Sequence, residues 1–254
     1  MKVTFLGTGT SQGVPVIGCQ CNVCQSDDPK DNRLRTSVLI ETGNVKIVID
    51  CGPDFRQQML REKITAINAI LITHSHKDHI GGLDDVRAFN YIQQKPAEVY
   101  ATDEVQQAIK REFSYAFGEN RYPGVPEIHL HSIRNSRFVA AGVDILPIKA
   151  RHFNDQYVFG FRIGDFSYLT DAVEITDEEK NKMKGSKVIV INALRKKTHY
   201  SHFTLEGALK ILSELKPEHG YLTHISHQMG KDADIEKELP GFVRLAYDRQ
   251  QVVI

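Results

Sequence analysis

The chain has 254 residues, of which 41% are hydrophobic and 25% charged, as is typical of a globular protein with a sizeable core. Its 32 Lys and Arg residues balance 32 Asp and Glu residues, so the net charge is zero. The overall charge therefore does not favour binding to nucleic acid or membranes. The sequence contains no run of 18 apolar residues, and its apolar N-terminal stretch is too short for a signal peptide. We therefore expect a cytoplasmic protein without a membrane span.

Short runs rich in Val, Ile and Tyr, ending at Gly, Asp, Asn or His, predict many β-strands. In chain order these are residues 2–6, 37–42, 46–51, 69–73, 98–101, 143–149, 157–163, 166–170, 188–192, 220–223, 243–247 and 251–254. Helices are predicted between them, at residues 54–61, 82–89, 103–111 and 204–215. Residues 114–126 are rich in Tyr, Phe and Pro and indicate an ordered loop. The alternation of strands and helices, without a linker or repeat, predicts a single α/β domain over residues 1–254 with its site on one rim.

The most informative motif is the run HSHKDH at residues 74–79, which directly follows the apolar strand 69–73. Three imidazoles and a carboxylate within six residues are hard to explain as packing. Neutral imidazole suits zinc, iron and similar ions, and carboxylate adds a harder ligand. The run therefore predicts a metal-dependent hydrolase.

Three further side chains of ligand type follow predicted strands: His152 after 143–149, Asp171 after 166–170 and His224 after 220–223. A lone histidine at a strand end is more often structural than a ligand. A dinuclear site, however, needs about three ligands per ion plus a bridge, which is more than the HSHKDH run supplies. We therefore expect these three residues to complete it.

A second cluster, Cys19, Cys21 and Cys24, offers three thiolates from one short loop. Such spacing favours metal binding or reactive thiols in a reducing compartment over a disulfide framework. A structural zinc needs four ligands, and His227, three residues beyond His224, is the best candidate for the fourth. A free, redox-active trio of thiols is the alternative.

Taken together, these motifs resemble the metallo-β-lactamase superfamily, whose fold is a four-layer αββα sandwich. The resemblance implies two ions, one held by His74, His76 and His152, one by Asp78, His79 and His224, and both by a bridging Asp171. A hydroxide between the ions would be the nucleophile. It also implies that Asp50 orients a ligand histidine by accepting its spare N–H, although Asp50 also suits a simple turn before Gly52. Mixed His and Asp ligands accept Mn, Zn, Fe or Ni.

Within this superfamily, the GTGTSQGVP loop at residues 7–15, the CxCxxC cluster, HSHKDH and the THISHQ segment at 223–228 resemble the PhnP-type cyclic phosphodiesterases over nearly the whole chain. Members of that family open 5-phosphoribosyl 1,2-cyclic phosphate, which implies a small, cyclic phosphodiester as substrate here. The resemblance further implies a structural zinc on Cys19, Cys21, Cys24 and His227, carried by a loop insertion at about residues 18–36. A homodimer is also a family expectation.

By family position, His202 is implied to be an additional catalytic histidine, acting together with the ligand Asp78. It precedes a helix capped by Thr204, whose N-terminus favours anions, and it could donate to a phosphoryl oxygen or protonate a leaving alkoxide. His199 is the competing choice. The basic residues 195–197 either meet a substrate phosphate or form a solvated loop.

Other functions of the same fold fit less well. An RNA-processing nuclease usually carries a basic or glycine-rich arm, which is not visible here. A lactone or thioester hydrolase generally lacks the CxCxxC cluster, and a non-hydrolytic protein of the PQQ-biosynthesis type departs from the metal motif. Residues 85–135 carry no motif that aligns and are expected to shape the pocket, with residues 115–122 as an aromatic wall. His129, His131 and His219 are predicted to be surface or core residues outside the site.

Overall fold

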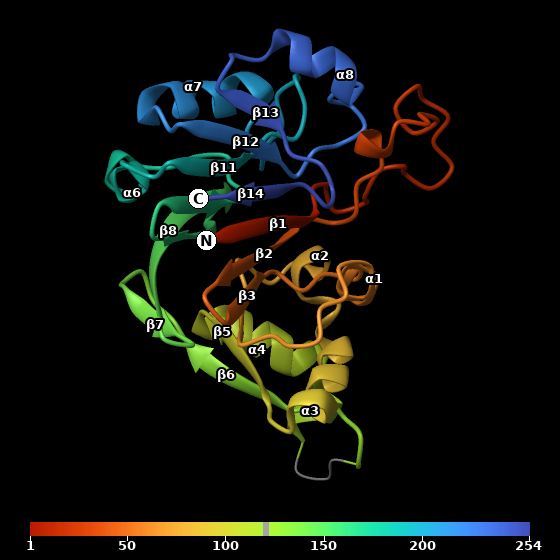
Figure 1. The fold of residues 1–254 in the computed structure, drawn as a ribbon, viewed down its shortest axis with the longest axis vertical. Helices are drawn as coiled ribbons and strands as arrows, with labels where there is room; N and C mark the ends of the chain where they lie inside the picture. The colour runs from red at the N-terminus through yellow and green to blue at the C-terminus, as the bar shows by residue number, and fades with distance from the viewer. Residues whose placement is uncertain (119–121) are drawn as a thin grey trace.

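The computed structural model describes residues 1–118 and 122–254, and within these ranges the strands form two seven-stranded sheets (Figure 1). In order across the first sheet these are β14 (Gln251–Val253), β1 (Lys2–Gly7), β2 (Ser37–Thr42), β3 (Val45–Ile49), β4 (Ala69–Leu71), β5 (Ala97–Ala101) and β6 (Ile128–Ser132). Those of the second are β13 (Val243–Leu245), β12 (His219–Thr223), β11 (Val188–Asn192), β10 (Phe166–Leu169), β9 (Gln156–Ile163), β8 (Val143–Phe153) and β7 (Phe138–Ala140). Because β1 pairs with β14, the two chain ends lie side by side.

Helices cover the outer face of each sheet (Figure 1). The first sheet carries α1 (Phe55–Arg61), α2 (Lys77–Ile80), α3 (Arg87–Gln93), α4 (Asp103–Glu112) and α5 (Ser114–Phe117). The second carries α6 (Asp177–Met183), α7 (Leu205–Leu215) and α8 (Asp232–Ile235). None of the helices in the described residues is both long and apolar enough to cross a membrane.

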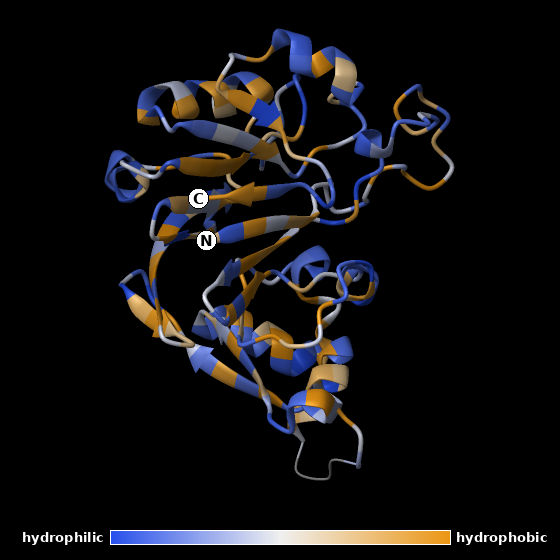
Figure 2. Cartoon of the chain, viewed as in Figure 1, coloured by the Kyte–Doolittle hydropathy of each residue, from blue (hydrophilic) through white to orange (hydrophobic). Residues whose placement is uncertain are grey.

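Three apolar layers hold the elements together, and Figure 2 shows apolar residues concentrated along the strands. Phe5 and Phe161 belong to the core between the sheets. Leu212 of α7 packs in the second core, and Phe55 of α1 in the third. Successive side chains of a strand point to opposite faces of the sheet. One face of each sheet packs in the core between the sheets and the other packs against helices, so both faces are buried. The predicted four-layer αββα sandwich is therefore confirmed.

Parallel strands bring the predicted site residues to one rim. Strands β3, β4 and β5 are parallel neighbours in the first sheet, as are β10, β11 and β12 in the second. The carboxyl ends of parallel strands meet at the same edge, so the loops that follow them converge there.

Three local predictions were wrong. His152 does not follow a strand but lies inside β8, because the β8–β9 hairpin stays paired as far as Phe153 and Gln156. The edge strands β6 and β7 and the helix α6 were not predicted. Part of the expected loop at 114–126 is the short helix α5, and residues 119–121 of that segment lie outside the described residues.

Candidate metal centre

Two groups of metal-ligand side chains meet at the rim. The first group is His74, His76 and His152, and the second is Asp78, His79, Asp171 and His224; in each, the candidate ligand atoms lie within 4.8 Å of one another. Asp171 is central, since its Oδ2 lies 3.3 Å from His79 Nε2 and 3.2 Å from His224 Nδ1. Ligands 2.0–2.2 Å from a tetrahedral ion stand ~3.3 Å apart, so this spacing suits divalent cations.

Several imidazole nitrogens face this space without a hydrogen-bond partner among the described residues. These buried atoms are His74 Nε2, His79 Nε2, His202 Nδ1 and His224 Nδ1. A buried polar atom without a partner costs about 1–3 kcal/mol, so four in one place call for a ligand. Divalent metal ions, which bind neutral imidazole nitrogen, fit this donor set.

In four of the site histidines, by contrast, the ring nitrogen on the outer side is held by an oxygen atom. The pairs are His79 Nδ1 with Asp50 Oδ2 (2.7 Å), His74 Nδ1 with Thr73 Oγ1 (3.1 Å), His152 Nδ1 with the Ser201 carbonyl (3.0 Å) and His224 Nε2 with Thr10 Oγ1 (3.4 Å). Such outer contacts fix the tautomer and orientation of metal-binding histidines. These contacts orient the ring nitrogens that face the centre even without a bound ion.

Among the residues that supply these outer oxygens, Asp50 is the most buried. Its carboxylate accepts from the N–H of Thr73 (2.9 Å) and from the hydroxyl of Thr73 (2.9 and 3.0 Å) as well as from His79. Burial raises the pKa of Asp50, while His79 and Thr73 favour its charged form. The Asp50 carboxylate therefore holds the outer nitrogen of His79.

The backbone is unusual at three site residues. Asp50, Asp171 and His224 have φ angles of 66°, 59° and 55°, in the left-handed region that residues with a Cβ rarely adopt. Each follows the end of a strand, β3, β10 and β12 respectively. Such conformations cost of order 1–3 kcal/mol each and cluster at functional sites.

Close packing at Gly52 holds the loop after β3 against α2. A Cβ on Gly52 would overlap the carbonyl oxygen of Asp78. The N–H of Cys51 donates to the His79 carbonyl (2.8 Å), and the N–H of Gly82 donates to the Cys51 carbonyl (2.8 Å). Glycine at position 52 is thus needed for the approach that sets Asp78 and His79 beside Asp50.

A cavity of about 520 Å³ lies over both groups and reaches His199, Tyr200 and His202. The His202 ring is stacked near His224, with centroids 4.8 Å apart, and its Nδ1 lies 3.8 Å from Asp171 Oδ1. Burial lowers the pKa of His202 to about 3, so its imidazole is neutral near pH 7. The Nδ1 of His199 instead accepts from the Ser201 N–H and hydroxyl (3.3 and 3.1 Å).

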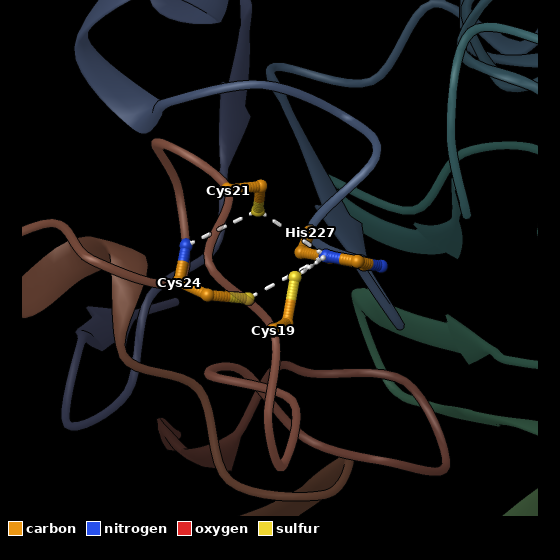
Figure 3. Close-up of side chains that lie close together, drawn as sticks. All are labelled: Cys19, Cys21, Cys24 and His227. Carbon is orange, nitrogen blue, oxygen red and sulfur yellow. Dashed lines mark hydrogen bonds between the residues drawn. The ribbon is translucent and has the colours of Figure 1, made fainter.

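The cysteine cluster forms a separate site. Cys19, Cys21 and Cys24 surround the Nδ1 of His227, with Sγ distances of 3.2, 3.3 and 3.5 Å (Figure 3). The N–H of Cys24 donates to Cys21 Sγ (3.5 Å) and lowers the Cys21 pKa to about 6, whereas burial raises the Cys24 pKa to about 11. Three sulfurs and one imidazole suit a tetrahedral zinc ion.

A buried ion pair fastens this loop to the rest of the chain. Arg33 Nη2 lies 3.0 Å from Asp232 Oδ2, and Arg33 Nη1 donates to the hydroxyl of Thr8 (3.0 Å). Beside it, the N–H of Ile225 donates to the Thr8 carbonyl (2.9 Å). The loop is therefore tied to the segment that carries both His224 and His227.

Residues 45–225 match the family described as the beta-lactamase superfamily domain. The chain belongs to the beta-lactamase superfamily. Among curated proteins, it is 37% identical over 257 residues to a Porphyromonas gingivalis protein named "Octanoyltransferase", a match covering 100% of this chain and 52% of that protein. The chain therefore spans about half the length of that relative. It is also 30% identical over 116 residues to coenzyme PQQ synthesis protein B of Methylorubrum extorquens, covering 40% of this chain and 37% of that one.

Solved structures narrow the relationship within the superfamily. The chain superposes on the crystal structure of a diphosphatase from the PhnP family with a TM-score of 0.93 and 37% identity, covering 100% of this chain and 97% of that one. Zinc-bound PqqB from Methylobacterium extorquens gives a TM-score of 0.78 at 16% identity, covering 100% of both chains, which shows a shared fold. The resemblance to the PhnP family is confirmed.

The two tyrosines of the expected aromatic wall do not form it, and residues 119–121 of that segment lie outside the described residues. Tyr115 lines neither cavity at the metal centre, and Tyr122 lines a separate one beside His129. For the basic residues 195–197, the contacts favour the solvated loop of the two alternatives, since Lys196 pairs with Glu238 at 2.7 Å. Arg195 donates to the Thr198 carbonyl at 2.9 Å.

Sequence reasoning missed the outer contacts from Thr10, Thr73 and Ser201. The GTGTSQGVP run, already part of the family resemblance, was the available signal for Thr10. No local pattern marks Ser201.

Proposed function

We propose that the chain is a phosphodiesterase that uses two divalent metal ions to hydrolyse a small phosphodiester. The observation that carries the proposal is the arrangement around Asp171. Its carboxylate lies within ligand range of His79 and His224 in the second group and of His152 in the first. His74, His79 and His224 each have one buried ring nitrogen without a partner and the other held by an oxygen atom. A shared carboxylate of this kind favours two ions over one.

In this proposal, one ion binds to His74, His76 and His152, the other to Asp78, His79 and His224, and both to Asp171. When bound, the two ions lower the pKa of water and neutralise charge that develops on phosphoryl oxygens. Asp50 orients His79 from behind. A third ion, a zinc, binds to Cys19, Cys21, Cys24 and His227 and has a structural role.

His202 is proposed to contact the reacting phosphoryl group. Its Nδ1 is buried, lacks a hydrogen-bond partner and lies 3.8 Å from Asp171 Oδ1. Because the imidazole is neutral near pH 7, we expect it to donate a hydrogen bond to a phosphoryl oxygen or the leaving oxygen. The Nδ1 of His199 is instead bonded to Ser201, so it is not assigned this contact with the phosphoryl group.

The rest of the substrate has room in a neighbouring cavity. This cavity, of about 350 Å³, shares His76, His152 and Gln156 with the first. Lys149 lines it with its Nζ 3.9 Å above the Tyr157 ring, and Arg134 lines it as well. A ribose 1,2-cyclic phosphate with a second phosphate would place its ester on the metal centre and that phosphate toward these cations.

A second candidate reaction is hydrolysis of a diphosphate, because the PhnP-family structure at 37% identity is named a diphosphatase. Both reactions transfer a phosphoryl group to water, so the centre serves either one. Acyl transfer has less support, since the chain spans only about half of the relative that carries the octanoyltransferase name.

Activity measurements on defined substrates test the proposal. The protein is stripped of metal and reloaded with Mn, Zn or Ni, then assayed with bis(p-nitrophenyl) phosphate, a ribose 1,2-cyclic phosphate and a diphosphate ester. We expect the cyclic ester to be cleaved fastest. His202→Ala should lower kcat about 100-fold or more, as loss of a positioned proton donor does, with metal content unchanged. His199→Ala is the matched control and should stay within a few-fold of the parent.

The outcomes separate the candidates. Preferential cleavage of the diphosphate ester would replace the phosphodiester assignment with the second candidate. Equal losses in His199→Ala and His202→Ala would remove the specific role of His202. No turnover of any phosphorus substrate with any metal would overturn the proposed function.

A further inference from the structure

Outside the metal centre, two histidines and a glutamate gather on strands β5 and β6. Glu98 lies directly opposite His129 in the parallel register of these strands, and Tyr100 lies opposite His131. Because side chains alternate between the faces of a sheet, Glu98, His129 and His131 share one face. The intervening residue Leu130 packs instead on the helix side.

The three side chains are close enough to bind one ion. Their ligand atoms lie within 4.8 Å of one another, with His129 Nδ1 3.6 Å from Glu98 Oε1 and His131 Nε2 in direct contact with Glu98 Oε2. Ligands of a tetrahedral ion stand ~3.3 Å apart, so small side-chain rotations complete the geometry. The His131 ring is held by stacking on Tyr100, with centroids 4.5 Å apart and planes 15° apart.

We propose that Glu98, His129 and His131 form an accessory site for a divalent transition metal, with zinc as the first choice. Two imidazoles and a carboxylate are a donor set that zinc uses when a fourth position stays open to water, whereas Mg²⁺ and Ca²⁺ prefer oxygen ligands. The side chains of His129 and His131 are 66% and 41% exposed, which leaves that position accessible.

A bound ion would join β5 to the edge strand β6. The residues directly after β6, Ile133 and Arg134, line the 350 Å³ cavity beside the metal centre. Metal at the accessory site would therefore stabilise one wall of that cavity. The site is independent of the proposed phosphodiesterase activity, because none of its three residues lines either cavity at the metal centre.

Equilibrium dialysis of the zinc-loaded protein against micromolar zinc tests the site. We expect the His129→Ala/His131→Ala variant to bind one zinc fewer per chain than the parent, and added zinc to raise the Tm of the parent only. His219→Ala, which removes a histidine on β12 outside these clusters, should bind as much zinc as the parent.

A second variant guards against disruption of β6 by the double substitution. Glu98→Gln keeps the side-chain shape and removes the charge, so the affinity of this one site should fall about tenfold or more while the fold is kept. Equal zinc content and affinity in the parent, the double variant and Glu98→Gln would overturn the site. A zinc loss in His219→Ala equal to that of the double variant would also overturn it, because surface histidines would then bind zinc without a built site.

Discussion

The His/Asp centre and the cysteine cluster differ in how their candidate ligands are held. The first draws residues from strand ends and loops of both sheets, and an oxygen atom holds the outer nitrogen of His74, His79, His152 and His224. The second takes three ligands from one short loop and His227 from another segment. Within residues 1–118 and 122–254, the sulfurs are supported by the backbone N–H groups of Val16 and Cys24.

This difference shows two ways of building a metal site. Where the fold fixes each ligand through a second contact, the geometry exists before the ion, and strained backbone at Asp171 and His224 can be sustained. Where ligands contact mainly one another, the ion itself supplies most of the order, and binding is coupled to local folding. The predictions below probe each side of that contrast.

The largest effect is expected at Asp171. Asp171→Asn keeps the shape but removes the charge between the two groups, so activity should fall more than the 10- to 100-fold that loss of an outer contact costs. We expect fewer bound ions per chain by elemental analysis and a matching loss of kcat/KM on bis(p-nitrophenyl) phosphate. Asp177→Asn, on a side chain that is 92% exposed, is the control. Retained activity with full metal content would show that Asp171 is not shared between ions.

A smaller loss is expected at Asp50. Asp50→Asn removes the charge that holds the His79 ring and exchanges one acceptor oxygen for a donor facing Thr73. Metal affinity and kcat/KM should fall about 10- to 100-fold, the range for such outer contacts. Thr73→Val removes the hydroxyl that contacts Asp50 and His74, but it keeps the Thr73 N–H bond to Asp50 and the charge beside His79, so it should have the weaker effect. If the order of the two variants is reversed, the orienting role belongs to Thr73.

How much of the centre could be predicted depends on whether the information is local. The HSHKDH run and the strand ends before Asp171 and His224 were visible in the sequence, because a strand followed by a ligand-type side chain is a local pattern. The left-handed backbone at these positions and the contact from Ser201 to His152 depend on distant segments. No short stretch of the sequence contains both partners of such a contact.

The same limit explains what was missed in the fold. Helix α6 has the sequence DEEKNKM, in which only Glu179 and Met183 are buried, so no apolar period marks it. The available signals were Thr176, whose hydroxyl accepts from the N–H of Glu179, and the acidic residues of the first turn. The buried pair of Arg33 with Asp232 joins residues 199 positions apart and was invisible in the sequence.

The smallest effect concerns the thiols of the cysteine cluster after metal removal. With the Cys21 pKa lowered to about 6 by the Cys24 N–H, the thiolate fraction rises through pH 6 and is nearly complete by pH 7 to 8. Alkylation of Cys21 by iodoacetamide, followed by peptide mass spectrometry, should therefore level off in that range, whereas a free thiol with a pKa near 8.5 continues to speed up. Cys51 is the internal control, since burial raises its pKa well above the ordinary value. Added zinc should suppress the labelling of Cys21. A rate that still climbs toward pH 9 would mean that the N–H bond is lost without the ion, so that zinc, and not the loop, sets the geometry of this cluster.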